Sequence, residues 1–98
     1  MSEPGAPPTP LMCLHATVSG RVQGVGFRMF VVDEAQRLDL KGWVRNCFDS
    51  TVEVTAEGRQ ADLEELARAL HDGPPLARVQ RVDIEWRSAT GGYAAFES

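Results

Sequence analysis

A glycine-rich stretch that joins two segments of different hydrophobic period constrains the fold of this chain most strongly. Residues 11–22 alternate apolar and polar side chains, which is the period of a strand with one buried face. From Phe27 onward the apolar side chains recur at helical spacing, which predicts an amphipathic helix of about three turns ending near Gly42. Between these segments, Ser19–Arg28 reads SGRVQGVGFR. The sequence therefore predicts a strand, a tight loop and a helix in direct succession.

This loop has the composition of an oxyanion cradle. Gly24 and Gly26 can adopt a positive φ and let a ligand approach the main chain closely. Successive amide N–H groups in such a turn can converge on one anion, and the first N–H groups of the following helix have no internal partner. Arg28 adds a planar, permanently charged group that can bind two phosphate oxygens at once.

The remaining chain predicts a small α+β domain. Strands, helix and a possible short last strand are expected, in order, at residues 42–48, 51–57, 61–71, 81–86 and 93–96. The order is therefore βαββαβ with a possible fifth strand. We expect a ferredoxin-like α/β sandwich, with two helices on one face of an antiparallel sheet. That fold hosts many unrelated activities, so it does not identify the function by itself.

Composition limits the class of protein and of partner. The chain has 98 residues, of which 43% are hydrophobic and 24% charged, as expected for one globular domain. Residues 1–10 contain four prolines and predict a disordered tail, which leaves 11–98 as the domain. The net charge of -4 argues against nucleic acid as a partner. No apolar run of ~20 residues and no signal pattern is present, so we expect a cytoplasmic protein without membrane contact. We also expect a monomer.

Other phosphate-binding loops do not fit the residues. The loop lacks the Gly-Lys-Ser/Thr ending of a Walker motif, and Met29 stands where a dinucleotide fingerprint needs its third glycine. Val22 occupies the place where a cysteine phosphatase would carry its nucleophile. No cluster of metal ligands accompanies the loop, so no metal is predicted there. A cradle with one arginine and no covalent nucleophile remains.

Such a cradle suits a mixed carboxylic–phosphoric anhydride better than an alkyl phosphate. The leaving group of the anhydride is a carboxylate with a pKa of about 4, so it departs without a general acid. Positioning a water in line with the phosphorus and holding the phosphoryl oxygens can then be sufficient. A neutral amide suits the water, because it accepts and donates hydrogen bonds without repelling the incoming charge.

Two motifs at matching separation carry a resemblance to a known family. Residues 20–28 (GRVQGVGFR) and 42–46 (GWVRN) together closely resemble the acylphosphatases, and the likeness extends through 52–54, the second helix and 73–79. The resemblance implies a ferredoxin-like sandwich and the hydrolysis of acyl phosphates to carboxylate and phosphate. It implies no metal and no organic cofactor. The implied partner is therefore a small-molecule acyl phosphate.

The resemblance also assigns roles to individual residues. Arg28 would bind the phosphate group, and Asn46 would hold the attacking water. The backbone amides that would help Arg28 belong to the phosphate loop Gln23, Gly24, Val25, Gly26, Phe27 and Arg28. Taken alone, Arg28 could be an ordinary helix-surface arginine and Asn46 an ordinary turn asparagine. The joint pattern of the two motifs favours the functional interpretation of both.

The chain departs from the family pattern after the asparagine. Where the family commonly has Thr-x-Asp-Gly, residues 47–50 read CFDS. Ser50 is expected to cost stability if the turn requires a positive φ, and Cys47 replaces a hydroxyl. Phe48 and Trp43 are expected to pack rather than to contact a ligand. These differences bear on the rate more than on the reaction.

Two further functions stay open from the residues. A binding module could keep affinity for phosphate or carbamoyl phosphate while serving a partner, as related domains do within a larger hydrogenase-maturation protein. An RNA-binding domain of the same fold would need exposed aromatic residues on its central strands and a basic surface. The acidic balance of this chain disfavours the RNA-binding alternative.

Overall fold

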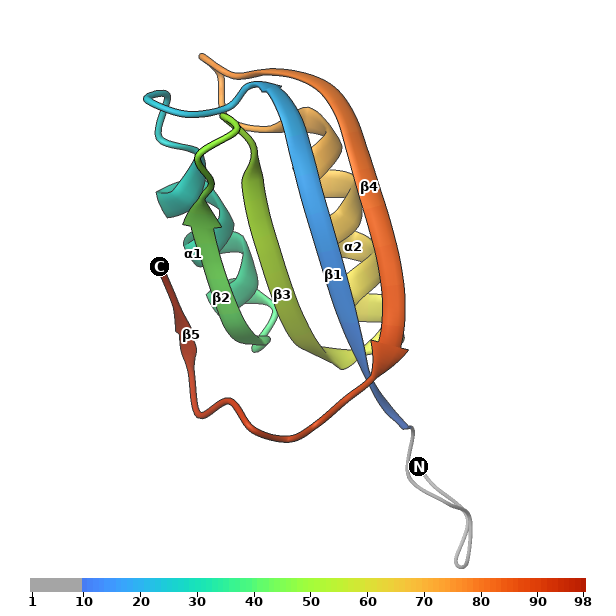
Figure 1. Cartoon of the computed structure of the whole chain (residues 1–98). Helices are drawn as coiled ribbons and strands as arrows, with labels where there is room; N and C mark the ends of the chain where they lie inside the picture. Colours follow the sequence, from blue (N-terminus) through green and yellow to red (C-terminus); the bar gives the residue numbers. More distant parts are fainter. Residues whose placement is uncertain (1–9) are drawn as a thin grey trace, which may run out of the picture.

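A computed structural model describes residues 10–98 and gives seven helices and strands in this part of the chain (Figure 1). Their bounds are β1 Leu11–Arg21, α1 Phe27–Arg37, β2 Lys41–Asn46, β3 Val52–Arg59, α2 Gln60–Asp72, β4 Arg78–Ser88 and β5 Phe96–Glu97. The predicted βαββαβ order is confirmed, and a short last strand is present, at Phe96–Glu97 instead of the predicted residues 93–96. Except for Pro10, the predicted tail lies outside the described residues. No helix in the described part is long and apolar enough to cross a membrane.

The five strands form one sheet in the order β4-β1-β3-β2-β5. The first four pair antiparallel, but β5 pairs parallel to β2, with Phe96 opposite Gly42. The prediction of a purely antiparallel sheet is therefore wrong at this edge. After β4 the chain crosses the end of the sheet to the opposite edge before it turns back, so β5 runs in the direction of β2 (Figure 1).

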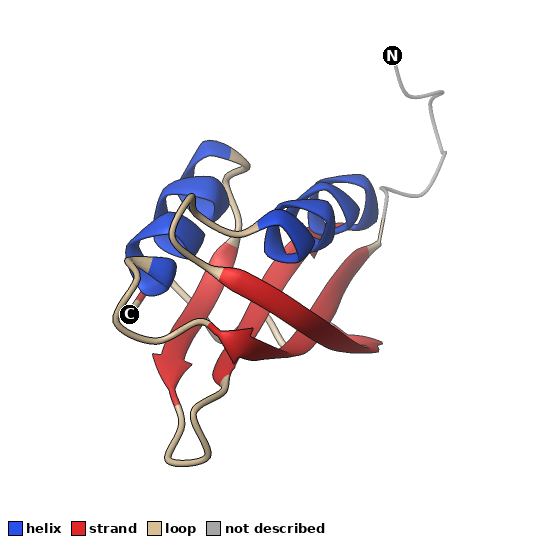
Figure 2. Cartoon of the chain, turned by 90° about the horizontal axis from the view of Figure 1, so that it is seen from above, coloured by secondary structure: helices blue, strands red, loops and turns tan. Residues whose placement is uncertain are grey.

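Both helices cover the same face of the sheet, as predicted (Figure 2). The alternation of the strands explains this arrangement, because every second residue of β1 and β3 points into the core. The fully buried side chains come from both layers: Leu14, Ala16, Val18, Val44, Val52, Val54 and Ala56 from the strands, and Phe27, Val31, Ala35, Leu63, Leu66 and Leu70 from the helices. The other face of the sheet carries polar and charged side chains.

Helix α1 ends earlier than the sequence indicates. Its last residue is Arg37, and Asp39 takes the left-handed conformation with φ 57°, while the N–H of Leu40 donates to the carbonyl of Ala35 at 2.8 Å. An aspartate can occupy that position because its short polar side chain tolerates left-handed backbone. Gly42, the predicted terminator, lies inside β2, where an added Cβ would stand 1.9 Å from the carbonyl oxygen of Thr55.

Glu57 fastens the segment between β4 and β5 to the sheet. Its nearly inaccessible carboxylate accepts hydrogen bonds from the backbone N–H of Thr90 and Gly91, at 2.8 and 2.9 Å, and from the Thr90 hydroxyl at 3.0 Å. Burial opposes ionisation, but these donors outweigh it, so the pKa of Glu57 is lowered in the folded protein. The final segment that borders β2 therefore depends on one carboxylate.

We expect Glu57→Gln to lower the free energy of unfolding by about 1.5–3 kcal/mol at neutral pH, because an amide cannot accept from all three donors. A lowered folded-state pKa stabilises the protein above the unfolded value of about 4.3, and this stability is lost as the pH falls through the folded pKa. Urea unfolding of both proteins should therefore show a difference that shrinks in acid. Asp33→Asn, at an exposed position on α1, is the matched control. A difference independent of pH would contradict the account.

Candidate active site

The loop between β1 and α1 has the backbone that its glycines predict. Gly24 and Gly26 both adopt the left-handed conformation, with φ of 73° and 80°. A Cβ built on either would meet no atom within 4 Å, so the backbone angles and not crowding require glycine here. The same observation means that open space lies directly over the main chain of the loop, where a ligand can approach it.

The amides of this loop are free to bind an anion. Among the hydrogen bonds of the described residues, none has a donor in the backbone N–H groups of residues 23–29; the first bond of the helix runs from Phe30 N–H to the Gly26 carbonyl at 3.1 Å. The first turn of α1 contains no acidic residue that would offset the positive end of the helix dipole. The start of α1 therefore presents donors and positive potential together.

Arg28 is the second residue of α1 and adds a full charge at this point. Its side chain is exposed, and it takes part in none of the ion pairs of the described residues. Because no carboxylate neutralises it, the guanidinium is available to an anion in the loop.

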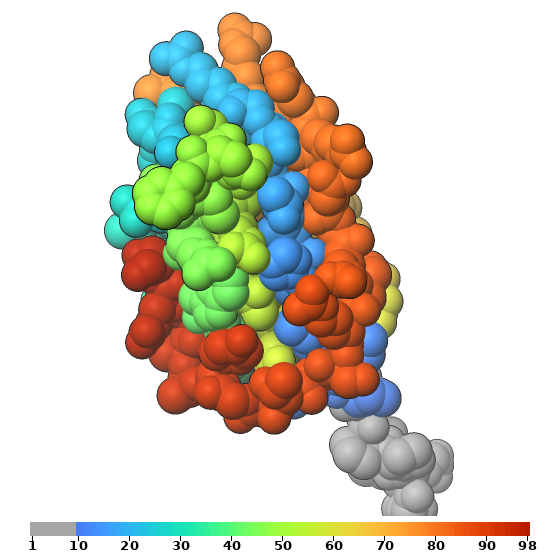
Figure 3. Space-filling model, viewed as in Figure 1, coloured from blue at the N-terminus to red at the C-terminus, as the bar shows by residue number. Residues whose placement is uncertain are grey.

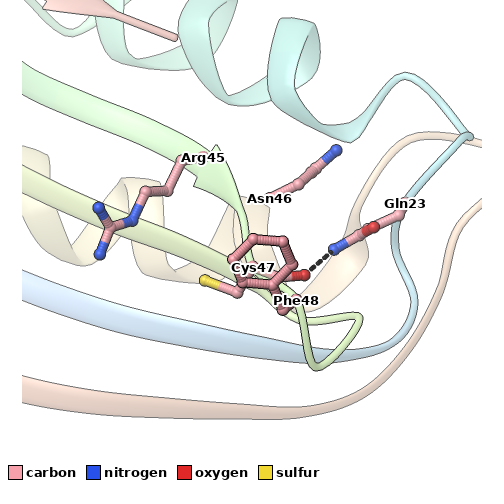
Figure 4. Close-up of a pocket in the computed structure, with 5 residues that line it drawn as sticks. All are labelled: Gln23, Arg45, Asn46, Cys47 and Phe48. Atoms are coloured by element: carbon pink, nitrogen blue, oxygen red, sulfur yellow. Dashed lines mark hydrogen bonds between the residues drawn. The ribbon is translucent and has the colours of Figure 1, made fainter.

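The side chain of Asn46 approaches the start of α1 from the sheet. It is the last residue of β2 and lies opposite Val52, so its side chain continues the row of β2 that faces the helices. Val44 fills the preceding position of that row in the core. Asn46 is exposed because it stands one step beyond the core, and its side chain points toward the start of α1, whereas Arg45 points to the other face (Figure 4).

Arg28 and Asn46 line one cavity of about 240 Å³. The other lining residues are Val22, Gly24, Gly26, Phe27, Met29 and Ser98. The cavity thus joins the arginine, the open loop glycines and the asparagine, as the two sequence motifs predict. The chemical roles of these residues stay predictions.

The side chain of Gln23 does not line this cavity and has a different function. Its amide donates to the carbonyls of Cys47 at 2.8 Å and Thr51 at 2.9 Å, which fastens the phosphate loop to the β2–β3 turn next to Asn46 (Figure 4). Of Gln23, only the backbone N–H is left for an anion. This clamp could not be found from the sequence, because nothing in the residue pattern brings position 23 to the turn.

We expect Gln23→Ala to lower kcat by about ten-fold and the free energy of unfolding by about 1–2 kcal/mol, because two hydrogen bonds that position the Asn46 turn are lost. Gln23→Glu should be at least as damaging, since a carboxylate would face two carbonyl oxygens without a proton to donate. Steady-state kinetics and urea unfolding measure the two effects, with exposed Gln36→Ala as the control. A fully active Gln23→Glu protein would contradict the clamp.

The β2–β3 turn requires a positive φ at Ser50, so the predicted loss of stability from a serine at this position applies. Ser50 adopts φ 73°, a conformation that favours glycine. We expect Ser50→Gly to raise the free energy of unfolding by about 0.5–1 kcal/mol, because glycine removes the strain of a left-handed Cβ. Ser50→Ala keeps the Cβ and should gain nothing in the same urea titration. An equal gain in both variants would show that the hydroxyl and not the backbone is responsible.

Behind the turn, a polar cluster lies on the open face of the sheet. Glu53 contacts His15 at 2.6 Å and Arg45 at 2.7 Å, and the thiol of Cys47 donates to it at 3.7 Å. The hydrogen bond with His15 is the main reason that the pKa of Glu53 is lowered. Arg45 also stacks over the ring of Trp43. Cys47 therefore belongs to this cluster and not to the cavity of Arg28.

Phe48 departs from the prediction that it packs. Its ring is fully exposed at the tip of the turn, where it borders a second hollow of about 630 Å³ that Asn46 also lines (Figure 4). The turn is too short to fold this residue back onto the core, so an apolar side chain alone does not indicate burial here.

The fold is that of a ferredoxin-like domain, and its cavity lies at the glycine loop before α1, which the sequence predicts to bind an anion. The family model for acylphosphatases matches residues 14–98, and the chain belongs to the acylphosphatase family. An acylphosphatase of Anaeromyxobacter dehalogenans is 52% identical over 82% of this chain and 86% of its own.

Solved structures agree with this assignment. The crystal structure of acylphosphatase from Bacillus subtilis has a TM-score of 0.85 and 37% identity, covering 88% of this chain and 96% of that one. Full-length HypF, solved in a phosphate- and nucleotide-bound form, contains a similar domain with a TM-score of 0.82 and 31% identity; the match covers 89% of this chain and 11% of HypF.

Proposed function

We propose that this chain hydrolyses the carboxyl–phosphate bond of acyl phosphates, giving a carboxylate and inorganic phosphate by direct attack of water. The observation that carries the proposal is the cavity shared by Arg28, Asn46 and the loop glycines. Family membership supports the same reaction. Because one chain supplies both Arg28 and Asn46, we expect a monomer to be active, and the cytoplasm stays the expected compartment.

The phosphate-binding part of the proposed site consists of the charged Arg28 side chain and the backbone N–H groups of the loop. The guanidinium of Arg28 binds two phosphoryl oxygens, and the free N–H groups from Gln23 to Arg28 bind the oxygens that face the loop. The backbone donors are fixed by the loop and the helix before substrate arrives. They therefore stabilise the charge that develops on the phosphoryl group without reorganising during the reaction.

The proposed role of Asn46 is to hold the water. The amide oxygen accepts a hydrogen bond from the water, and its position at the cavity wall, facing the start of α1, aims the water oxygen at the phosphorus. Among the described residues that line the cavity, Ser98 carries the only hydroxyl, and no imidazole, thiol or carboxylate side chain lies beside it in the lining to activate it as a nucleophile. The carboxylate leaving group needs no proton, so the lining supports attack by water without a covalent intermediate on the enzyme.

Hydrolysis of acetyl phosphate in H₂¹⁸O, with a metal chelator present, tests the proposal. Attack at phosphorus places the label in the inorganic phosphate and leaves the acetate unlabelled. Label in the acetate would contradict attack at phosphorus. Calorimetric binding of phosphate without turnover of any acyl phosphate would instead indicate a binding module.

A further inference from the structure

Two arginines face each other across the sheet near the phosphate loop. Arg21 ends β1 and Arg78 begins β4, and the two are paired in the antiparallel register. Both side chains are exposed, and neither takes part in the ion pairs of the described residues. Like charges directly opposite each other destabilise a sheet. By contrast, Arg81 and Arg87 of the same strand β4 each pair with a carboxylate.

The pair lines its own cavity, of about 350 Å³, next to the candidate active site. The loop after β1 and the segment before β4 lie side by side at this end of the molecule (Figure 3). Gly24 borders both this cavity and the one that holds Arg28 and Asn46. Gly24 has no side chain, and open space lies where its Cβ would be, so no side chain at position 24 separates the two cavities.

The line from the attacking water through the phosphorus to the leaving group is expected to run from Asn46 toward Arg21 and Arg78. In-line attack places the leaving group on the side of the phosphorus opposite the water. The water is held from β2, and the sheet order β4-β1-β3-β2 places the Arg21–Arg78 pair on the other side of β3. We therefore expect the acyl part of a bound substrate to extend toward the cavity of the two arginines.

We propose that Arg21 and Arg78 form a second anion subsite, which binds a carboxylate or phosphate carried on the acyl part of the substrate. The inference rests on the proposed function and names its substrate class: acyl phosphates with a second negative group. An anion between the two guanidinium groups removes their repulsion and forms charge-assisted hydrogen bonds with both. It also gives a role to two facing arginines that take part in none of the ion pairs of the described residues.

Three acyl phosphates of similar length test this subsite. Hexanoyl phosphate has an apolar tail, adipoyl monophosphate ends in a carboxylate, and 5-phosphonopentanoyl phosphate ends in a phosphonate. For the unmodified protein at low salt, we expect kcat/KM to be about ten-fold higher for the charged tails than for hexanoyl phosphate. The difference between the carboxylate and the phosphonate shows which anion the subsite prefers. High salt should reduce the preference, because exposed charges are screened.

The double variant R21Q/R78Q should lose this preference while keeping its activity on hexanoyl phosphate within about two-fold, since neither arginine belongs to the phosphate loop's binding groups or holds the water. The control R59Q/R68Q removes two exposed charges elsewhere and should keep the preference. The inference is overturned if the unmodified protein shows no preference, if R21Q/R78Q keeps it, or if the control loses it equally. If hexanoyl phosphate is not hydrolysed at all, the proposed function itself fails.

Discussion

Arg28→Ala is expected to lower kcat/KM for acetyl phosphate by about 10³-fold, because Arg28 is the one charged side chain among the described residues that line the loop cavity of about 240 Å³. The free energy of unfolding should change by less than about 0.5 kcal/mol, since Arg28 is exposed and has no ion pair to lose. Steady-state kinetics and urea unfolding of the same preparations measure the two quantities.

The conservative variant separates charge from geometry. Arg28→Lys keeps the charge but loses the two parallel donors, so we expect it to recover only part of the lost activity. Arg68→Ala, which removes an exposed arginine from α2, should behave as the unmodified protein. Near-normal turnover by Arg28→Lys would argue strongly against binding of two phosphoryl oxygens by the guanidinium.

Asn46→Ala is expected to lower kcat by about 10²–10³-fold with little change in KM, because the amide contacts the water and not the phosphoryl group. The exposed side chain makes no hydrogen bond among the described residues, so stability should be unaffected. Measuring kcat and KM separately is therefore the informative experiment. A raised KM with unchanged kcat would show that Asn46 binds substrate and would contradict its role toward water.

The parts of the fold that could be predicted from the sequence are those set by neighbouring residues, through the spacing of apolar side chains and the backbone freedom of glycine. The alternation in β1 and β3 and the left-handed angles of Gly24 and Gly26 are both of this kind. The parallel pairing of β5 could not be predicted, because it depends on the path of residues 89–95 around the end of the sheet. The hydrogen bonds of Glu57 that hold this path join residues more than thirty positions apart.

In the candidate site, too, some features follow from local sequence and others depend on how distant segments pair. The juxtaposition of Arg28 and Asn46 follows from two motifs, each placed at the end of a predictable element. The Gln23 clamp and the Arg21–Arg78 pair depend on register and loop path, which residue patterns do not encode. In particular, a shift in register between Ser19 and Gly20 decides which residue of β4 faces Arg21.

A crystal structure with orthovanadate, which resembles the phosphoryl group under attack, would show whether one cavity binds both the phosphoryl group and the attacking water. We expect vanadate in the cavity between the loop and β2, with the Arg28 guanidinium on two of its oxygens, backbone N–H groups of residues 23–28 around it, and an apical oxygen hydrogen-bonded to the Asn46 amide. Vanadate bound elsewhere, or bound in this cavity with Asn46 turned away from it, would contradict the account.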